Sequence, residues 1–345
     1  MSIPPLPPCK LIVGLTLLGL LACGGALAGY LAPYPYEEQH REHPHAPPTR
    51  IHFDGFGRAP YVHASAIVDY AQKNYVEDRS QRYPLRFLAG GRPFISVDGP
   101  ARIFLLGTDG LGRDIFSRLL YGARLSLAIV GLSLLISLPL ALLVGGLAGY
   151  YGGAVDFIGM RLIELLLALP AIYLIISLRS ALPLDLEPGQ VTLAMVGCLT
   201  LFGWATLARL TRGVVLSLRE RDFVTAAMAL GATDRRIIFR HIMPQLTGFM
   251  LVQASLAAPG FMLAEVTLSY LGLGIPEPLP SWGNMLASAG EAANLAARWW
   301  SLAPAAAIFI TTFAFHLLAD ALGRIFDPRD EGLEAQRNAK FLSSL

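Results

Sequence analysis

Six long apolar stretches alternate with polar segments along this chain. Each is close to the ~20 residues that a helix needs to cross a bilayer. The runs are continuous and do not alternate with a period of two, which favours helices over the strands of a membrane barrel. The stretches are Leu11–Leu31, Leu125–Tyr150, Phe157–Leu182, Val191–Leu210, Gly248–Leu273 and Ser301–Leu322. The pattern predicts an all-α membrane protein with six transmembrane helices and an enlarged polar segment after the first of them.

The composition is typical of a protein that crosses a membrane several times. Of 345 residues, 54% are hydrophobic and 15% are charged, whereas soluble domains carry about 25% charged residues. The only lysines are Lys10, Lys73 and Lys340, and none follows a glycine-rich loop. A G-x-x-x-x-G-K-[ST] phosphate-binding loop is therefore excluded, and H-E-x-x-H and G-x-S-x-G are absent from the sequence. We expect a protein that is not an enzyme and that takes its energy from a partner or an ion gradient.

Basic residues indicate which polar segments face the cytoplasm. Seven arginines lie between Arg209 and His241, and four more basic residues follow Leu322. The positive-inside rule places both regions in the cytoplasm, and six spans then put both termini there. The predicted organisation is a first helix within 1–32, an extracytoplasmic segment at 33–118, a five-helix core at 119–329 with a cytoplasmic loop at 209–244, and a tail at 330–345.

The N-terminal stretch has a second interpretation. Ala26-Leu27-Ala28 is compatible with a signal-peptidase site, and Leu20-Leu21-Ala22-Cys23 with a lipoprotein signal. The apolar run is long for a signal peptide, so we favour an uncleaved membrane anchor.

The arginine-rich loop contains an apolar stripe at helical spacing. Four residues stand at i, i+3, i+4 and i+7, which places them on one face of a helix. These are Phe223, Ala226, Ala227 and Leu230. Gly231 follows as a predicted helix C-cap, Asp234 is predicted to cap a second short helix, and Pro244 to limit it. We call residues 223–244 the knob, because two short helices broken at a glycine suit docking into a groove on another protein. A plain connecting loop is the alternative.

The 33–118 segment is rich in Pro, His and aromatic residues. Short strands with a turn at Asp54-Gly55 are expected within it. His40, His43 and His45 are weak candidates for a metal site, since imidazoles at this density can bind Zn²⁺, Cu²⁺ or Ni²⁺. A solvated stretch without a metal is the favoured interpretation.

Several polar residues interrupt the apolar stretches. Charge at bilayer depth is costly, so such residues should face the bundle interior, a wet cavity or the interface. Hydrogen bonding between helices is the favoured interpretation, and a polar translocation path is the alternative. The residues are Glu164, Gln253, Glu265, His316 and Asp320.

Two motifs resemble one family. Residues 107–114 resemble the Gly-Thr-Asp-x-x-Gly-Arg-Asp signature of the C-type permease subunit of dipeptide and oligopeptide importers. The matching residues are Gly107, Thr108, Asp109, Gly112, Arg113 and Asp114. The knob resembles the coupling loop of ABC-importer permeases through Ala226, Ala227, Gly231 and Pro244, although Thr225 stands in place of the family's glutamate.

The resemblance covers about Leu106 to Arg329. It continues through Asp156, Arg161, Pro170, Ser269–Gly274, Pro280–Gly283, Asp320 and Asp327–Arg329.

That resemblance implies a permease subunit in the cytoplasmic membrane that takes up short peptides or a related solute, such as a nickel chelate. The implied partners are a second homologous permease, two cytoplasmic ABC ATPase subunits and an extracytoplasmic solute-binding protein. No cofactor and no nucleic acid are implied. ATPase contacts are expected from the apolar stripe, Gly231 and Pro244, with Arg235 and Arg236 at the rim. A self-sufficient ion-driven carrier or channel, with Glu164, Glu265 and Asp320 as ion sites, is the alternative.

Overall fold

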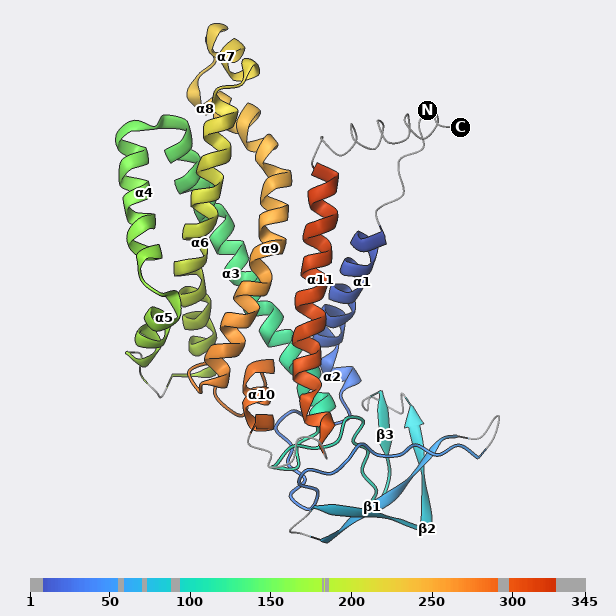
Figure 1. Cartoon of the computed structure of the whole chain (residues 1–345). Coiled ribbons are helices and arrows are strands. Elements are labelled where there is room, and N and C mark those ends of the chain that lie inside the picture. The colour runs from blue at the N-terminus through green and yellow to red at the C-terminus, as the bar shows by residue number, and fades with distance from the viewer. Residues whose placement is uncertain are drawn as a thin grey trace, which may run out of the picture.

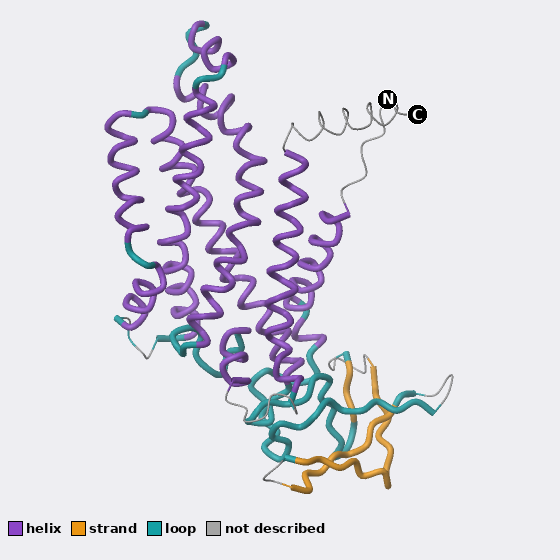
Figure 2. Tube along the Cα trace, viewed as in Figure 1, coloured by secondary structure: helices purple, strands orange, loops and turns teal. Residues whose placement is uncertain are grey.

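The computed structural model describes residues 9–54, 59–69, 73–87, 94–181, 183, 186–290 and 298–326. These residues form a bundle of long, roughly aligned helices with a small sheet at one end and a short helical projection at the other (Figure 1). The colouring by secondary structure separates the helical bundle from the strands and loops of the sheet (Figure 2). We refer to the two ends as the sheet end and the knob end.

Five helical segments in the described part of the chain are long and apolar enough to cross a membrane. Their principal helices are α1 (Cys9–Ala26), α3 (Ile115–Tyr151), α6 (Pro188–Arg219), α9 (Met243–Tyr270) and α11 (Ala303–Phe326). Shorter helices connect them: α2 (Ala28–Leu31), α4 (Gly153–Ala168), α5 (Ala171–Ser180), α7 (Asp222–Ala229), α8 (Asp234–Arg236) and α10 (Trp282–Gly290). A π-helical turn, η1 (Ile237–Ile242), precedes α9, and a 3₁₀ turn, η2 (Trp299–Leu302), precedes α11.

The third apolar stretch, predicted as one span, is divided into α4 and α5. Leu169 is extended, with φ −96° and ψ 136°, and Pro170 follows it. Proline lacks the N–H that would continue the helix, and it disfavours helical backbone at the residue before it. Leu182, the predicted end of this span, lies outside the described residues. The six predicted spans therefore correspond to five long helical segments and one pair of short helices.

Helices α3 and α6 make the most extensive helix–helix contact of the described chain. Gly145 and Gly149, four residues apart on α3, allow this approach. A Cβ atom on Gly145 would lie 2.2 Å from the carbonyl oxygen of Ala208, and one on Gly149 would lie 2.8 Å from that of Arg212. Small residues at this spacing are typical of close helix packing in membranes.

The chain is not all-α, because the 33–118 segment contains a three-stranded antiparallel sheet. Its strands are β1 (Tyr61–Asp69), β2 (Asn74–Phe87) and β3 (Ile95–Val97), in the order β1-β2-β3. Ser65 pairs with Glu77 across the first two strands, and Arg86 pairs with Ser96 across the last two. A small apolar cluster forms beneath the sheet from Val62, Leu85, Ala101 and Ile103. Of the short strands expected around Asp54-Gly55, only the one after the turn forms, as β1, whereas the residues before it contribute a single bridge between His52 and Tyr61. Gly55 of the expected turn lies outside the described residues.

Candidate functional site

Helix α7 of the knob ends in a glycine C-cap, as predicted. Gly231 has a φ of +76°, a backbone conformation that glycine adopts at little cost. Its N–H donates to the carbonyl of Met228 at 2.9 Å, and the N–H of Ala232 donates to that of Ala227 at 3.0 Å. This pair of bonds is a Schellman motif, which satisfies carbonyls that the end of the helix leaves free. The turn after α7 is thus set by local backbone chemistry.

The predicted apolar stripe of α7 does not lie on one surface. Val224 is fully buried and Ala227 is 8% exposed, and both pack into the chain's own core. Phe223 and Ala226 are exposed, and Leu230 is 88% exposed. The buried face of α7 is therefore rotated about the helix axis, by about one residue position, relative to the predicted stripe. Ala227 supports the knob from inside, whereas the other three stripe residues are available to a partner.

The second half of the knob differs from the prediction. Thr233, not Asp234, occupies the N-cap of α8, and no side-chain capping bond forms there. Asp234 instead accepts a 2.8 Å hydrogen bond from the Tyr150 hydroxyl at the end of α3. Pro244 lies in the first turn of α9, where proline is tolerated, so it does not limit the helix. One helical segment runs from Asp234 to Tyr270, and the side chains of Arg235 and Arg236 are exposed near its start.

The signature loop at residues 107–114 is held by the backbone of residues 40–46. Thr108 donates its N–H to the carbonyl of Ala46 at 2.9 Å, and its hydroxyl donates to that of His43 at 2.5 Å. Gly112 has a φ of +76°, and a Cβ there would lie 2.0 Å from the carbonyl oxygen of His40. A Cβ on Gly107 would lie 2.5 Å from that of Ala46. These two signature glycines are therefore required by close backbone approach.

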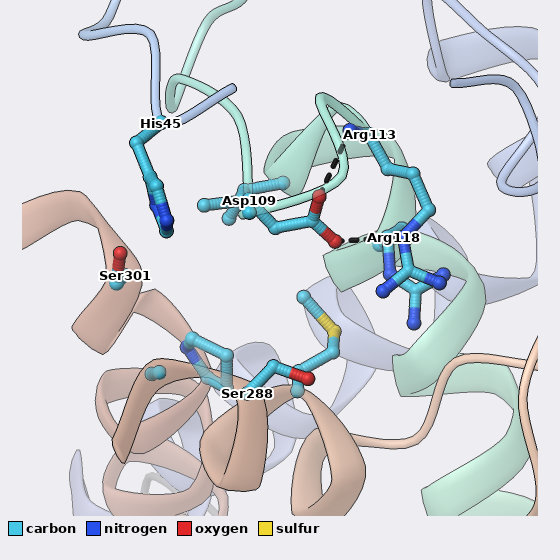
Figure 3. Close-up of a pocket in the computed structure, with 11 residues that line it drawn as sticks. His45, Asp109, Arg113, Arg118, Ser288 and Ser301 are labelled. Carbon is cyan, nitrogen blue, oxygen red and sulfur yellow. Dashed lines mark hydrogen bonds and ion pairs between the residues drawn. The ribbon is translucent and has the colours of Figure 1, made fainter. Parts of the chain in front are cut away.

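Asp109 and Arg113 of the signature, together with Arg118 of α3, line a small pocket (Figure 3). Asp109 accepts hydrogen bonds from the N–H of Arg113 at 2.9 Å and from its Nε at 2.7 Å. The Arg113 and Arg118 side chains are almost fully buried, and both bind Glu277 on the turn between α9 and α10. Glu277 was not predicted as a site residue, because no local sequence motif connects it to arginines about 160 residues earlier.

Asp114 is the N-cap of α3. Its carboxylate accepts the N–H of Ser117 at 2.8 Å and the hydroxyl of the same residue at 2.6 Å. Burial raises the pKa of Asp114 to about 6, because the charged form loses its hydration. The last signature residue thus starts the long helix that follows.

The three histidines that were weak metal candidates do not form a site. Burial lowers the pKa of His40 to about 4, and this ring packs on Tyr34. His43 Nε2 lies 3.1 Å from the carbonyl oxygen of Ser65, whereas the His45 ring lies beside Gly110. The part of the chain that the structure describes contains no group of three His, Cys, Asp or Glu residues placed to hold a metal ion. The prediction of a solvated stretch is also wrong for His40, which is buried.

Glu265 is fully buried and joins three helices. It accepts a 3.2 Å hydrogen bond from the Ser126 hydroxyl on α3 and a 2.8 Å bond from the Ser269 hydroxyl on its own helix. Ser126 in turn lies 3.3 Å from the N–H of Trp282 at the start of α10. This geometry matches the interpretation of hydrogen bonding between helices.

The other polar residues of the apolar stretches lie on separate surfaces. Glu164 is exposed on α4, 3.1 Å from an arginine one turn earlier, and Gln253 lines a largely apolar cavity between α6 and α9. His316 is exposed on α11 and bonds to the backbone of its own helix. Asp320 pairs with Lys10 of α1. The chain by itself does not bring these residues to one cavity.

Comparison with known proteins identifies the class of transporter. The family described as the binding-protein-dependent transport system inner membrane component matches residues 141–330. The chain belongs to this family. It is 40% identical over 231 residues to the dipeptide transport system permease protein DppC of Bacillus subtilis, a match that covers 67% of this chain and 70% of the relative.

Two further relatives have similar names. The permease is 39% identical over 230 residues to the oligopeptide transport system permease protein OppC of Bacillus subtilis, covering 67% of this chain and 73% of the relative. It is 38% identical over 232 residues to the glutathione transport system permease protein GsiD of Pectobacterium atrosepticum, covering 67% and 75%. The resemblance drawn from the signature is confirmed. The permease is a multi-pass subunit of an ABC importer in the inner membrane; it is not an enzyme, and ATP hydrolysis belongs to separate subunits.

Proposed function

We propose that this permease forms half of the membrane path of an ATP-driven importer of short peptides or related small solutes. The other half would be a second, homologous permease. Two cytoplasmic ABC ATPase subunits would supply energy, and an extracytoplasmic binding protein would deliver the solute. The names of the relatives, which refer to dipeptide, oligopeptide and glutathione transport, support this substrate class.

The proposed topology has six crossings, with α4 and α5 together making the third. Their 16 and 10 residues amount to roughly 39 Å of helix at 1.5 Å per residue, enough for the ~30 Å hydrocarbon core. The knob end would face the cytoplasm, because the arginine-rich loop lies there. The start of α1 and the end of α11 also point toward that end (Figure 1), so both termini would be cytoplasmic and the 33–118 segment extracytoplasmic.

The observation that carries this proposal is the exposed apolar surface of the knob. Helix α7 lies beyond the end of the bundle (Figure 1), and the side chains of Phe223 on it and Leu230 at its C-cap are 39% and 88% exposed. Apolar side chains on such a projection are typical of helix-in-groove docking. Movement of the ATPase subunits would then displace the knob and, through the continuous segment that begins at Asp234, shift the spans between inward- and outward-open states. A self-sufficient carrier would need no such projection.

Two of the polar residues are proposed to face the solute path. Glu164 is exposed on α4, and Gln253 opens into the cavity between α6 and α9. A second permease packed on these surfaces would enclose both side chains.

The proposal is tested by purifying the tagged permease from its native membranes in mild detergent and identifying the proteins that accompany it. Leu230→Asp places a charge on the exposed apolar tip. Leu111→Asp is the matched control, since it changes another exposed leucine at the sheet end. We expect an ABC ATPase and a second permease with the unmutated chain, and loss of the ATPase alone with Leu230→Asp. An ATPase that stays bound to the Leu230→Asp variant, or a chain that purifies alone, would refute the docking assignment.

A further inference from the structure

Two buried arginines, Arg113 just before α3 and Arg118 in its first turns, share the carboxylate of Glu277 from the turn between α9 and α10. Arg113 Nη1 lies 2.5 Å from Glu277 Oε2, and Arg118 Nη2 lies 3.1 Å from both oxygens of the same carboxylate. The Arg118 side chain is only 2% exposed. Two guanidinium groups this close repel each other unless an anion lies between them. Asp109 forms an ion pair with Arg113 and acts on Arg118 only through its charge, without an ion pair. Glu277 is therefore the anion that makes the arrangement possible.

Glu277 reaches this position from the surface. Its side chain is 44% exposed, and it lies on the turn that connects α9 to α10. Arg118 also donates at 3.3 Å to the carbonyl of Pro278, so the arginine contacts both side chain and backbone of the turn. The arginines are fixed in the protein and the carboxylate is presented from outside. This is the geometry of a receptor and its ligand, with both parts on one chain.

Helix α3 and the helical segment that contains α9 are also joined at the knob end. Tyr150, the last but one residue of α3, donates its hydroxyl to Asp234, the first residue of the helical segment that becomes α9. Between these ends, Ser126 of α3 donates to Glu265 of α9 at 3.2 Å. Helix α3 and the segment from Asp234 are thus tied at both ends and in between.

We propose that Arg113 and Arg118 form a carboxylate receptor, and that Glu277, by occupying it, latches the α9–α10 turn to the start of α3. Glu277 is a positioning residue for transport. The proposal rests on the proposed function of the knob, because the latch matters only if the knob moves α9. With the latch closed, a displacement at Asp234 moves α3 and α9 together. Without it, the bonds at Tyr150 and Ser126 still join the two helices, but the α9–α10 turn moves away from the start of α3 and the sheet end of the bundle responds less.

The experiment is chemical rescue in proteoliposomes that contain the complete importer. Glu277→Ala leaves a space lined by two guanidinium groups, open to solvent where the glutamate was exposed. We expect solute uptake to fall at least about fivefold, the lower range for coupling between distant sites. Sodium formate at tens of millimolar should restore at least half of it by supplying the missing carboxylate, and sodium chloride at equal ionic strength should not. The double variant Glu277→Ala with Arg118→Ala should not respond to formate.

Controls separate the latch from simple loss of structure. Asp98→Ala removes a different ion pair of the 33–118 segment, 2.7 Å from Arg86, and should transport normally. If Glu277→Ala does not assemble, Glu277→Gln keeps the shape of the side chain and should show the same loss of uptake. The latch is refuted if either assembled variant transports like the unmutated protein, or if formate fails to restore the Glu277→Ala variant.

The ATPase content of each purified complex separates this test from that of the knob. An unmutated complex without an ATPase refutes the proposed function. A Glu277→Ala complex that keeps its ATPase but gives no formate rescue refutes only the latch.

Discussion

Gly145 and Gly146 are neighbours on α3 in different surroundings, so the same substitution at each isolates the packing between α3 and α6. A Cβ on Gly145 would lie 2.2 Å from the carbonyl oxygen of Ala208, whereas a Cβ on Gly146 would meet nothing within 4 Å. Both glycines are helical with ordinary φ values. Replacing either by alanine favours the helix by about 1 kcal/mol, so that contribution is the same for the two variants.

The cost at Gly145 follows from the contact distance. Carbon and oxygen atoms ordinarily approach to about 3.3 Å, so the two backbones must separate by roughly 1 Å. Overpacking of this kind costs about 1–3 kcal/mol, and the upper value applies because the neighbour is backbone that cannot rotate away. Gly145→Ala should then be destabilised by about 2 kcal/mol and Gly146→Ala stabilised by about 1 kcal/mol, a difference of about 3 kcal/mol.

Thermal unfolding of the purified permease in mild detergent measures this difference. Gly149→Ala should fall between the other two, because its Cβ would lie 2.8 Å from the carbonyl oxygen of Arg212. The expected order of stability is Gly146→Ala, Gly149→Ala, Gly145→Ala. If Gly145→Ala unfolds at the same temperature as Gly146→Ala, the close approach of α3 and α6 is not what requires a glycine there.

Three further predictions concern the 33–118 segment and the knob. Because the pKa of Asp114 is raised to about 6 from 3.8, the contribution of this carboxyl group to folding stability should fall as pH rises from about 4 to above 6, by up to about 3 kcal/mol. Asp114→Asn keeps the cap and should abolish that fall, which unfolding temperatures at pH 4.5 and pH 8 would show. Gly112→Ala should destabilise far more than Gly231→Ala, although both have a φ of +76°, because only Gly112 faces a carbonyl oxygen at 2.0 Å; equal unfolding temperatures would contradict this. The pKa of His40 is lowered to about 4, so the contribution of this imidazole to folding stability should fall as pH drops from about 6.5 toward 4, and the difference in unfolding temperature between His40→Phe and the unmutated protein should change over that pH range.

The features that the sequence predicted correctly are those decided by local backbone chemistry. Gly231 ends α7 because a helix end needs a residue with positive φ, and that need is visible within a few positions. The break at Pro170 has a similarly local cause, but it was not predicted, because the third apolar stretch was taken as one helix. One strand near Asp54-Gly55 was expected and forms as β1, but β2 and β3 were not predicted, and the fold class was taken to be all-α.

The incorrect predictions concern which part of the molecule each side chain contacts. The stripe on α7 was found, but Ala227 points into the chain's own core, because helical periodicity defines a face and not the neighbour that covers it. Glu277 is 164 residues from Arg113, and no propensity or motif connects residues so far apart. Tyr150 carried no signal either, as a tyrosine at the end of an apolar helix is ordinary. The Gly145-x-x-x-Gly149 spacing could have been read from the sequence.

The 33–118 segment leaves and rejoins the bundle at one place. The Tyr34 hydroxyl lies 3.0 Å from the N–H of Ile103, Thr49 donates its N–H to Phe104 at 2.8 Å, and His40 donates its N–H to Gly112 at 3.2 Å. Hydrogen bonds thus join its two ends, and only the N–H of Phe94 adds a bond to α2 from the described part of the sheet, at 2.6 Å from the Tyr30 carbonyl oxygen. For this reason we expect that the length of chain between the two ends can change with little movement of α2 or α3. Doubling a loop costs only about 0.6 kcal/mol in closure entropy. We therefore expect that a shorter or different insert between residues 50 and 102 would leave the helices in register.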